Sequence, residues 1–347
     1  MNRRALLPAL ALASALTLSG CMAGENTPTT EAGADDATAG ATQGGTLNID
    51  FATYNPLSLV IKDQGWLEAE LAEQDITVNW VQSAGSNKAN EALRAEAIDV
   101  GSTAGSAALL ARSNGSPIKA IDIYSQPEWA ALVTLPDSGI TSVEDLRGKS
   151  IAATRGTDPY FFLLQALEQA GVDQSEVTIE NLQHADGRSA LTSGAVDAWA
   201  GLDPIMAAAE KDGAELFFRD IDFNSYGFLN ATETFLEEKP DVAQTVVNAY
   251  ERAREWAKEN PEETAAILAE VAAIDPAVAS SVIIDRTNLD VDPAPGEAQR
   301  SVLEKIGPVF VETGDVPSQE AIDTALDSLF DTSLIENADP SSIGAAS

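Results

Sequence analysis

The feature that most constrains the fold of this chain is a pattern repeated through its middle: a short strand-forming run, a polar turn and a helix-forming run. The five repeats span residues 76–97, 98–115, 149–171, 177–194 and 196–213. Strands that alternate with helices form βα units, in which a largely parallel sheet is covered by helices on both faces. Ligands of open α/β sheets bind beyond the carboxyl ends of the strands, where these polar turns lie. The predicted fold class is therefore α/β, with a ligand site among the turns.

A further unit of the same kind precedes these five. Residues 47–51 (LNIDF) alternate between apolar and polar side chains, which is typical of a half-buried strand. Pro56 is well placed to begin a helix and Gly65 to end it. The turn between this strand and this helix carries Thr53, Tyr54 and Asn55.

The later part of the chain changes to a mainly helical pattern. Four apolar residues between 246 and 257 recur at spacings of four, three and four, which predicts one apolar helix face, and Asn260-Pro261 ends that helix and begins another. We therefore expect two lobes. Lobe 1 comprises 46–127 and the mainly helical 228–335, lobe 2 comprises 128–227, and 336–347 form a tail.

The N-terminus has the features of an export signal. Arg3 and Arg4 precede the apolar run 5–17, which is too short for a transmembrane span of about 20 residues. The sequence LSGC at 18–21 predicts cleavage of residues 1–20 and lipidation of Cys21, the only cysteine; an ordinary secretory signal with an incidental cysteine is the alternative. Residues 21–45 have almost no large apolar side chains and are predicted to be a flexible tether.

Charge and composition exclude several function classes. The formal net charge of −35 argues against nucleic acid and anionic membrane surfaces as partners. His184 is the only histidine and is expected to be exposed or to make a local hydrogen bond. No metalloprotease, nucleophile-elbow, phosphate-loop or dinucleotide motif is present. We therefore expect no enzyme activity, no cofactor and no metal.

Four polar turns precede predicted helices and combine small hydroxyl residues with unpaired backbone N–H groups, which suits an anion. A single hydroxyl here is better explained by helix capping, but several turns at one sheet edge place their donors together. The candidate residues in these turns are Thr53, Tyr54 and Asn55; Ser83, Gly85 and Ser86; Ser102, Thr103 and Ser106; and Arg155, Gly156 and Thr157.

Charged residues near these turns allow alternative roles. The guanidinium of Arg155 can bind a sulfonate or carboxylate, or can form a surface ion pair with Asp158 or another acid. Asp158 is expected to cap the helix that begins at Pro159. Asp203 is expected to cap a helix or to accept a hydrogen bond from a ligand amine or hydroxyl.

Aromatic residues near the turns could contact an apolar ligand tail. They are Trp129, Tyr160, Trp199 and Tyr226, although an aromatic residue taken alone is more often part of the core.

Four motifs carry a family resemblance: TYNPLSLVIKDQGWLE at 53–68, EALRAEAIDVGSTAGSAALLA at 91–111, RGTDPYFFLLQALEQAG at 155–171, and HADGRSALTSGAVDAWAGLDP at 184–204. Their order after the lipobox and tether resembles that in ABC-transporter substrate-binding proteins for aliphatic sulfonates, within the nitrate, taurine and sulfonate group. The resemblance covers nearly all of residues 46–335 and implies a two-lobed type II periplasmic-binding fold.

The resemblance also implies a function and a set of contacts. Two lobes would close on a sulfonate, whose head group is held by hydroxyls and backbone amides at helix starts, and an ABC permease and ATPase would be partners of a monomer. By position, it assigns Tyr54 and Asn55 to the first turn, Ser102 and Thr103 to the third, and 156–158 to the turn entering lobe 2. Taurine, nitrate or a thiamine-precursor-like heterocycle are alternative ligands, and enzymes of this fold are a further alternative.

Overall fold

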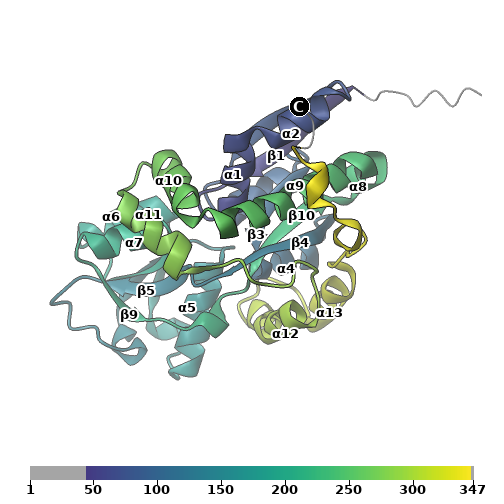
Figure 1. The fold of residues 1–347 in the computed structure, drawn as a ribbon. Coiled ribbons are helices and arrows are strands. Elements are labelled where there is room, and N and C mark those ends of the chain that lie inside the picture. Colours follow the sequence, from purple (N-terminus) through teal and green to yellow (C-terminus); the bar gives the residue numbers. More distant parts are fainter. Residues whose placement is uncertain (1–43, 345–347) are drawn as a thin grey trace, which may run out of the picture. The chain divides into compact units, whose positions relative to one another are not determined.

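The computed structural model describes residues 44–344 (Figure 1). The predicted signal segment, Cys21 and nearly all of the predicted tether lie outside the described residues. No described helix combines the length and apolar character that crossing a membrane requires. No group of three or more His, Cys, Asp or Glu side chains within 44–344 is arranged to hold a metal ion.

The first sheet has six strands in the order β11-β4-β10-β3-β1-β2. β1 pairs in parallel with β2 and β3, whereas β10 lies antiparallel between β3 and β4, and β11 extends the edge beyond β4. The strands are β1 (Gly45–Phe51), β2 (Ile76–Gln82), β3 (Val100–Ala104), β4 (Ile118–Pro127), β10 (Gly227–Thr232) and β11 (Thr287–Asn288).

The second sheet has five strands in the order β7-β6-β8-β5-β9. β6 pairs in parallel with β7 and β8, and β5 runs antiparallel between β8 and β9. The strands are β5 (Ala130–Thr134), β6 (Ser150–Ala153), β7 (Thr178–Asn181), β8 (Ala198–Leu202) and β9 (Glu215–Phe218). We call the segment between β4 and β10 lobe 2 and the rest of the described chain lobe 1.

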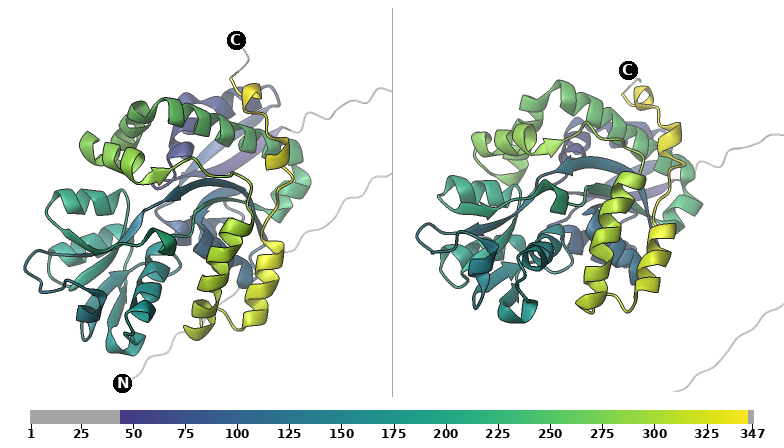
Figure 2. Two further views of the ribbon diagram at one scale, coloured as in Figure 1. Left: turned by 60° about the horizontal axis from the view of Figure 1, so that its bottom comes forward. Right: turned by 90° about the horizontal axis from the view of Figure 1, so that it is seen from below.

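Helices surround both sheets, and the C-terminal pair α12 and α13 packs beside α4 (Figure 2). Lobe 2 contains α5 (Asp158–Gln169), α6 (His184–Thr192) and α7 (Ile205–Lys211). Lobe 1 contains α1 (Pro56–Gln64), α2 (Trp66–Ala72), α3 (Ser86–Arg94), α4 (Gly105–Ser113), α8 (Glu233–Glu238), α9 (Pro240–Glu259), α10 (Pro261–Ala272), α11 (Pro276–Ser280), α12 (Glu297–Glu312) and α13 (Gln319–Ser328).

The helix boundaries follow from local chemistry. α1 begins at Pro56, and Gly65 ends it in the left-handed region at φ 64°, where its N–H donates to the carbonyl of Ile61. The apolar stripe predicted between 246 and 257 is buried in α9, and α10 begins at Pro261 as predicted. These short-range signals are confirmed.

Apolar contacts join the two lobes on two sides. The rings of Phe161 on α5 and Phe310 on α12 lie 4.4 Å apart, centroid to centroid. A second buried cluster includes Leu59 from α1 and Ala207 from α7, with side chains of α10, α11 and the π-helical turn Ser281–Asp285 between them. The segment from α10 to β11 therefore links lobe 2 to lobe 1.

Candidate functional site

The sequence-predicted site residues occupy three places at the boundary between the lobes. Thr53, Tyr54, Trp129 and Asp203 line one small pocket. Gly85, Arg155, Gly156 and Thr157 belong to the starts of helices α3 and α5. The others are buried in polar networks or in the core: Asn55, Ser102, Thr103, Asp158 and Tyr160.

The pocket at Tyr54 is bounded by residues from both lobes. The hydroxyl of Tyr54 donates to the carbonyl oxygen of Ser102 at 2.9 Å, and its ring meets Trp129 edge-on at a centroid distance of 6.0 Å. The pocket leaves about 10 Å³, room for about one water molecule. A ligand larger than water can enter here only when the lobes separate.

Arg286 also lines this pocket and was not identified from the sequence. Its guanidinium is largely buried and forms ion pairs with Asp203 at 3.2 Å and with Glu210. Asp203 also accepts a hydrogen bond from the backbone N–H of Ala207 at 2.9 Å, and burial raises the pKa of its carboxyl to about 6. Asp203 therefore combines the predicted capping role with a salt bridge between the lobes.

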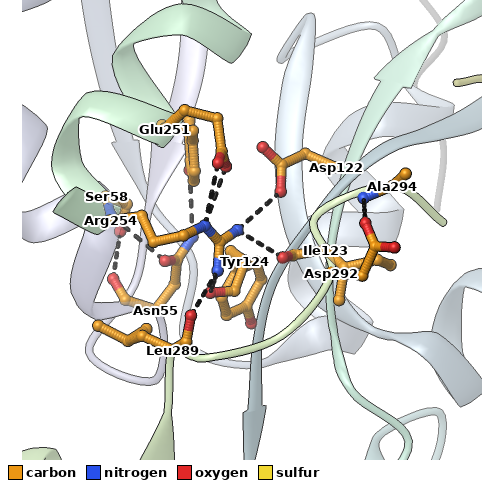
Figure 3. A network of polar contacts seen from close by, with 11 residues as sticks. Asn55, Ser58, Asp122, Ile123, Tyr124, Glu251, Arg254, Leu289, Asp292 and Ala294 are labelled. Atoms are coloured by element: carbon orange, nitrogen blue, oxygen red, sulfur yellow. Dashed lines mark hydrogen bonds and ion pairs between the residues drawn. The ribbon is translucent and has the colours of Figure 1, made fainter. Parts of the chain in front are cut away.

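Asn55 has a structural role at the start of α1. Its Oδ1 accepts from the N–H of Ser58, and its Nδ2 donates to the hydroxyl of Tyr250 on α9 at 3.1 Å. Figure 3 shows this contact beside the buried guanidinium of Arg254, which donates to Asp122, Glu251 and three backbone carbonyl oxygens. The network joins α1 and α9 to β4 and leaves both polar atoms of Asn55 engaged within the protein.

Ser102 and Thr103 are fully buried on β3. Both the N–H and the hydroxyl of Ser102 donate to Oδ1 of Asp50 at 2.9 Å, and the hydroxyl of Thr103 donates to the carbonyl oxygen of Ala104. Burial raises the pKa of the Asp50 carboxyl to about 7. The side chains of Ser102 and Thr103 are therefore engaged within the sheet of lobe 1.

Asp158 does not cap α5, contrary to the sequence prediction. Its carboxylate instead accepts hydrogen bonds from Ser106, from Nε1 of Trp129 at 2.8 Å, and from the N–H and hydroxyl of Ser225. Burial raises the pKa of this carboxyl. Four hydrogen-bond donors, contributed by both lobes, therefore surround the carboxylate of Asp158.

Arg155 does not form the surface ion pair that was one of its two predicted roles. It is exposed, makes no ion pair with any described residue, and places its guanidinium carbon 5.6 Å from the centre of the Tyr160 ring. Tyr160 itself is buried against Phe161. The ion pair with Asp158 does not form because the Asp158 carboxylate is buried and bonded to Ser106, Trp129 and Ser225.

Three helix N-termini meet at the lobe boundary beside Gly85, and none has a hydrogen bond from the side chain of its N-cap residue. Gly85 precedes α3, and a Cβ placed on it would lie 3.0 Å from Nε2 of His184, the first residue of α6. A Cβ on Gly156, just before α5, would lie 3.6 Å from Cβ of Asn87 on α3. The start of α3 thus lies beside the starts of both α5 and α6.

The hydroxyl that could cap α5 is engaged elsewhere. Thr157 donates to the carbonyl oxygen of Thr154 at 2.6 Å, so it caps no N–H group of its helix. Beside these helix starts lies a pocket of about 240 Å³ that Asn87, Gly156 and Leu110 help to line. His184, expected to be exposed or locally bonded, is 1% exposed and contacts Thr154. The expectation of an exposed side chain was wrong, because α6 begins inside the boundary between the lobes.

Proteins of known sequence resemble this chain over most of its length. A protein from Escherichia coli (strain K12) named as aliphatic sulfonates-binding is 27% identical over 264 residues, which is 75% of this chain and 82% of the relative. One from Bacillus subtilis (strain 168) with the same name is 30% identical over 235 residues, 67% of this chain and 70% of the relative. A riboflavin-binding protein from Chloroflexus aurantiacus is 24% identical over 220 residues, 62% of this chain and 61% of the relative.

Solved structures share the fold. The alkanesulfonate-binding protein SsuA from Xanthomonas axonopodis pv. citri, bound to MOPS, superposes with a TM-score of 0.72 at 23% identity, covering 81% of this chain and 97% of that one. The desulfurization enzyme DszB superposes with a TM-score of 0.62 at 15% identity, covering 84% and 98%. The predicted α/β fold of periplasmic binding proteins is confirmed, and enzymes also use it.

A family model described as NMT1/THI5-like matches residues 58–264. This match extends from α1 through both lobes into α10. The chain therefore belongs to the NMT1/THI5-like family.

Proposed function

We propose that this protein is the extracytoplasmic solute-binding component of an ABC importer, which binds a small organosulfonate between its lobes and delivers it unchanged to a membrane permease. The names of the Escherichia coli and Bacillus subtilis relatives support the ligand class. The two-sheet fold and the contacts between the lobes support binding by closure.

The observation that carries the proposal is the meeting of α3, α5 and α6 at their N-termini. The first N–H groups of a helix have no partner within it and carry partial positive charge, so an anion is stabilised there. Three starts without side-chain caps supply donors from both lobes. A sulfonate has three acceptor oxygens and fits such a site without a paired cation.

The carbon tail of the ligand has room beside this anion site. The 240 Å³ pocket lined by Asn87, Gly156 and Leu110 borders the helix starts. Its lining combines amide groups and apolar atoms with the charged side chains of Glu91 and Arg94. The rings of Tyr54 and Trp129 line the second pocket between the lobes and would offer it an aromatic wall if the lobes part.

We propose binding without catalysis. The only histidine has a pKa lowered to about 4 by burial, so it is neutral near pH 7. The only cysteine is Cys21, in the predicted lipobox. The alternatives within the class are taurine, nitrate or a thiamine-precursor-like heterocycle, and the riboflavin-binding relative favours including flavins in any test.

Isothermal titration calorimetry on the purified protein tests the ligand class. The panel comprises methane-, ethane- and butanesulfonate, taurine, nitrate, sulfate and riboflavin. We expect one site per chain with at least one organosulfonate bound at micromolar affinity or tighter. Binding of riboflavin or nitrate with no sulfonate bound at millimolar concentration would contradict the proposal.

Lipid anchoring and the transporter partners belong to the same proposal. We infer that Cys21 carries lipid, that residues 21–45 tether the lobes outside the membrane, and that a permease and an ATPase complete the importer. The lipobox sequence LSGC supports the anchor.

A further inference from the structure

His184 is a buried polar side chain at the place where three helix starts meet. It is the only histidine of the chain and is 1% exposed. Its Nε2 points from lobe 2 toward Gly85 of lobe 1, where a Cβ would approach it to 3.0 Å. Only glycine at position 85 leaves this space open.

The hydrogen bonds around the ring determine its tautomer. The hydroxyl of Thr154 lies 2.6 Å from the carbonyl oxygen of Leu182, which can only accept, so the hydroxyl proton is donated there. The same hydroxyl oxygen lies 3.2 Å from Nδ1 of His184 and must then accept the Nδ1 proton. Burial lowers the pKa of the ring to about 4, so a second proton is absent near pH 7. Nε2 therefore presents a lone pair.

This lone pair faces no donor in the described part of the chain. Nε2 of His184 is buried and has no hydrogen-bond partner there, and the same holds for Oδ1 of Asn87. Both atoms lie about 3 Å from the position that a Cβ on Gly85 would take, so they share one small space between the lobes. A buried acceptor without a donor is destabilising, so a bound group that donates a hydrogen bond to it is favoured.

We propose that the ligand is a short organosulfonate carrying a hydroxyl or amino group one or two carbons from the sulfonate, and that this group donates a hydrogen bond to Nε2 of His184. The inference rests on the proposed function, because it places the sulfonate at the starts of α3, α5 and α6. His184 begins α6, so a donor that reaches it must lie close to the head group.

Matched ligands test this geometry by calorimetry. Ethanesulfonate and 2-hydroxyethanesulfonate differ by one hydroxyl, and 2-aminoethanesulfonate places an amine at the same carbon. We expect wild type to prefer a donor-bearing ligand over ethanesulfonate by about tenfold. The preference should fall to within about twofold in His184→Leu and be partly kept in His184→Gln, which retains an acceptor. Because His184 lies at the start of α6, the preference of each variant is expressed relative to the ethanesulfonate affinity of that same variant.

The single histidine allows a direct measurement on unmodified protein. With ¹⁵N-labelled imidazole, we expect Nε2 to be unprotonated before and after binding and its resonance to move toward the shielded values of a hydrogen-bonded acceptor. Calorimetry at pH 7 in two buffers of different ionisation enthalpy should detect no proton uptake. Protonation of Nε2, uptake of a proton, or equal affinity for the matched ligands overturns the inference, even if His184→Leu does not fold. Absence of binding to every sulfonate instead removes the proposed function itself.

Discussion

Asp50 couples the stability of lobe 1 to pH. Its carboxyl lies fully buried at the end of β1, with a folded-state pKa of about 7 against 3.8 in an unfolded chain. Between these values the folded protein holds a proton that the unfolded chain has lost. The contribution of Asp50 is therefore most favourable below pH 4, falls as pH rises to 7, and is constant above.

The substitution Asp50→Asn removes this dependence while keeping an acceptor for Ser102. We expect the free energy of unfolding of the variant, relative to wild type, to rise by up to about 4 kcal/mol between pH 4 and pH 8. Urea unfolding at several pH values measures the difference, so other titrating groups cancel. A difference that does not vary with pH would show that the buried carboxyl has an ordinary pKa.

A substitution at Gly85 tests whether the two lobes pack tightly against each other at the anion site. Gly85→Ala places a methyl group 2.9 Å from Oδ1 of Asn87 and 3.0 Å from Nε2 of His184. Overpacking of this kind destabilises the contact between the lobes by about 1–3 kcal/mol. Because the ligand is bound between the lobes, sulfonate affinity should fall by about tenfold or more. Calorimetry measures the loss. Gly45→Ala is the control, because its methyl group meets only Nζ of Lys239, at 3.7 Å. Equal affinities of the two variants would place the ligand elsewhere.

The candidate site could be predicted from the sequence only in part. The turns were identified because Ser, Thr, Gly and Asn precede helix-forming runs. Whether such a residue faces the ligand or the protein depends on partners far along the chain, as Asn55 illustrates through Tyr250, 195 residues away. Arg286 had no local signal, because its partner Asp203 is 83 residues away and lies in the other lobe.

At the scale of elements, the segment from α10 to β11 links the lobes through apolar and ionic contacts. Arg286 on this segment pairs with Asp203, which is 3% exposed, and with Glu210 on α7. Removing the cation leaves a buried carboxylate without its partner. Such a change typically lowers the free energy of unfolding by about 3–5 kcal/mol.

We therefore expect Arg286→Met to lower the free energy of unfolding by about 3 kcal/mol, and the double substitution with Asp203→Asn to recover part of this loss. Urea unfolding at pH 7 measures both. Lys211→Met is a matched control, since the pair of Lys211 with Asp275 joins the same elements but is exposed and worth less than about 1 kcal/mol. Equal losses in the two single variants would refute a special role for Arg286.

The strands with strong local patterns could be predicted from the sequence. A strand whose place depends on pairing with distant strands of the sheet could not. β1, β2, β3, β6, β7 and β8 lie where alternation or βα order placed them. β10 is a six-residue run whose buried Asn230 interrupts the apolar pattern, because its amide donates to Thr103 on the neighbouring strand. Its place at the centre of the first sheet follows from long-range pairing that no short pattern contains.

At the scale of the whole molecule, the lipid anchor determines where the protein acts. If Cys21 carries lipid, Cys21→Ser should move the protein from the membrane fraction to the soluble extracytoplasmic fraction with ligand affinity unchanged. Fractionation followed by immunoblotting and mass spectrometry of the N-terminus measures this. Retention of the variant in the membrane would indicate a different means of attachment.

The position of β10 sets an order of assembly for the chain as it is synthesised. β10 lies between β3 and β4, yet it leaves the ribosome only after β5–β9 have been made. Until then β3 and β4 lack their shared neighbour and expose unpaired backbone groups. Lobe 2, in contrast, is one continuous segment. A nascent or translocating chain can therefore complete lobe 2 first, while lobe 1 must wait for its central strand.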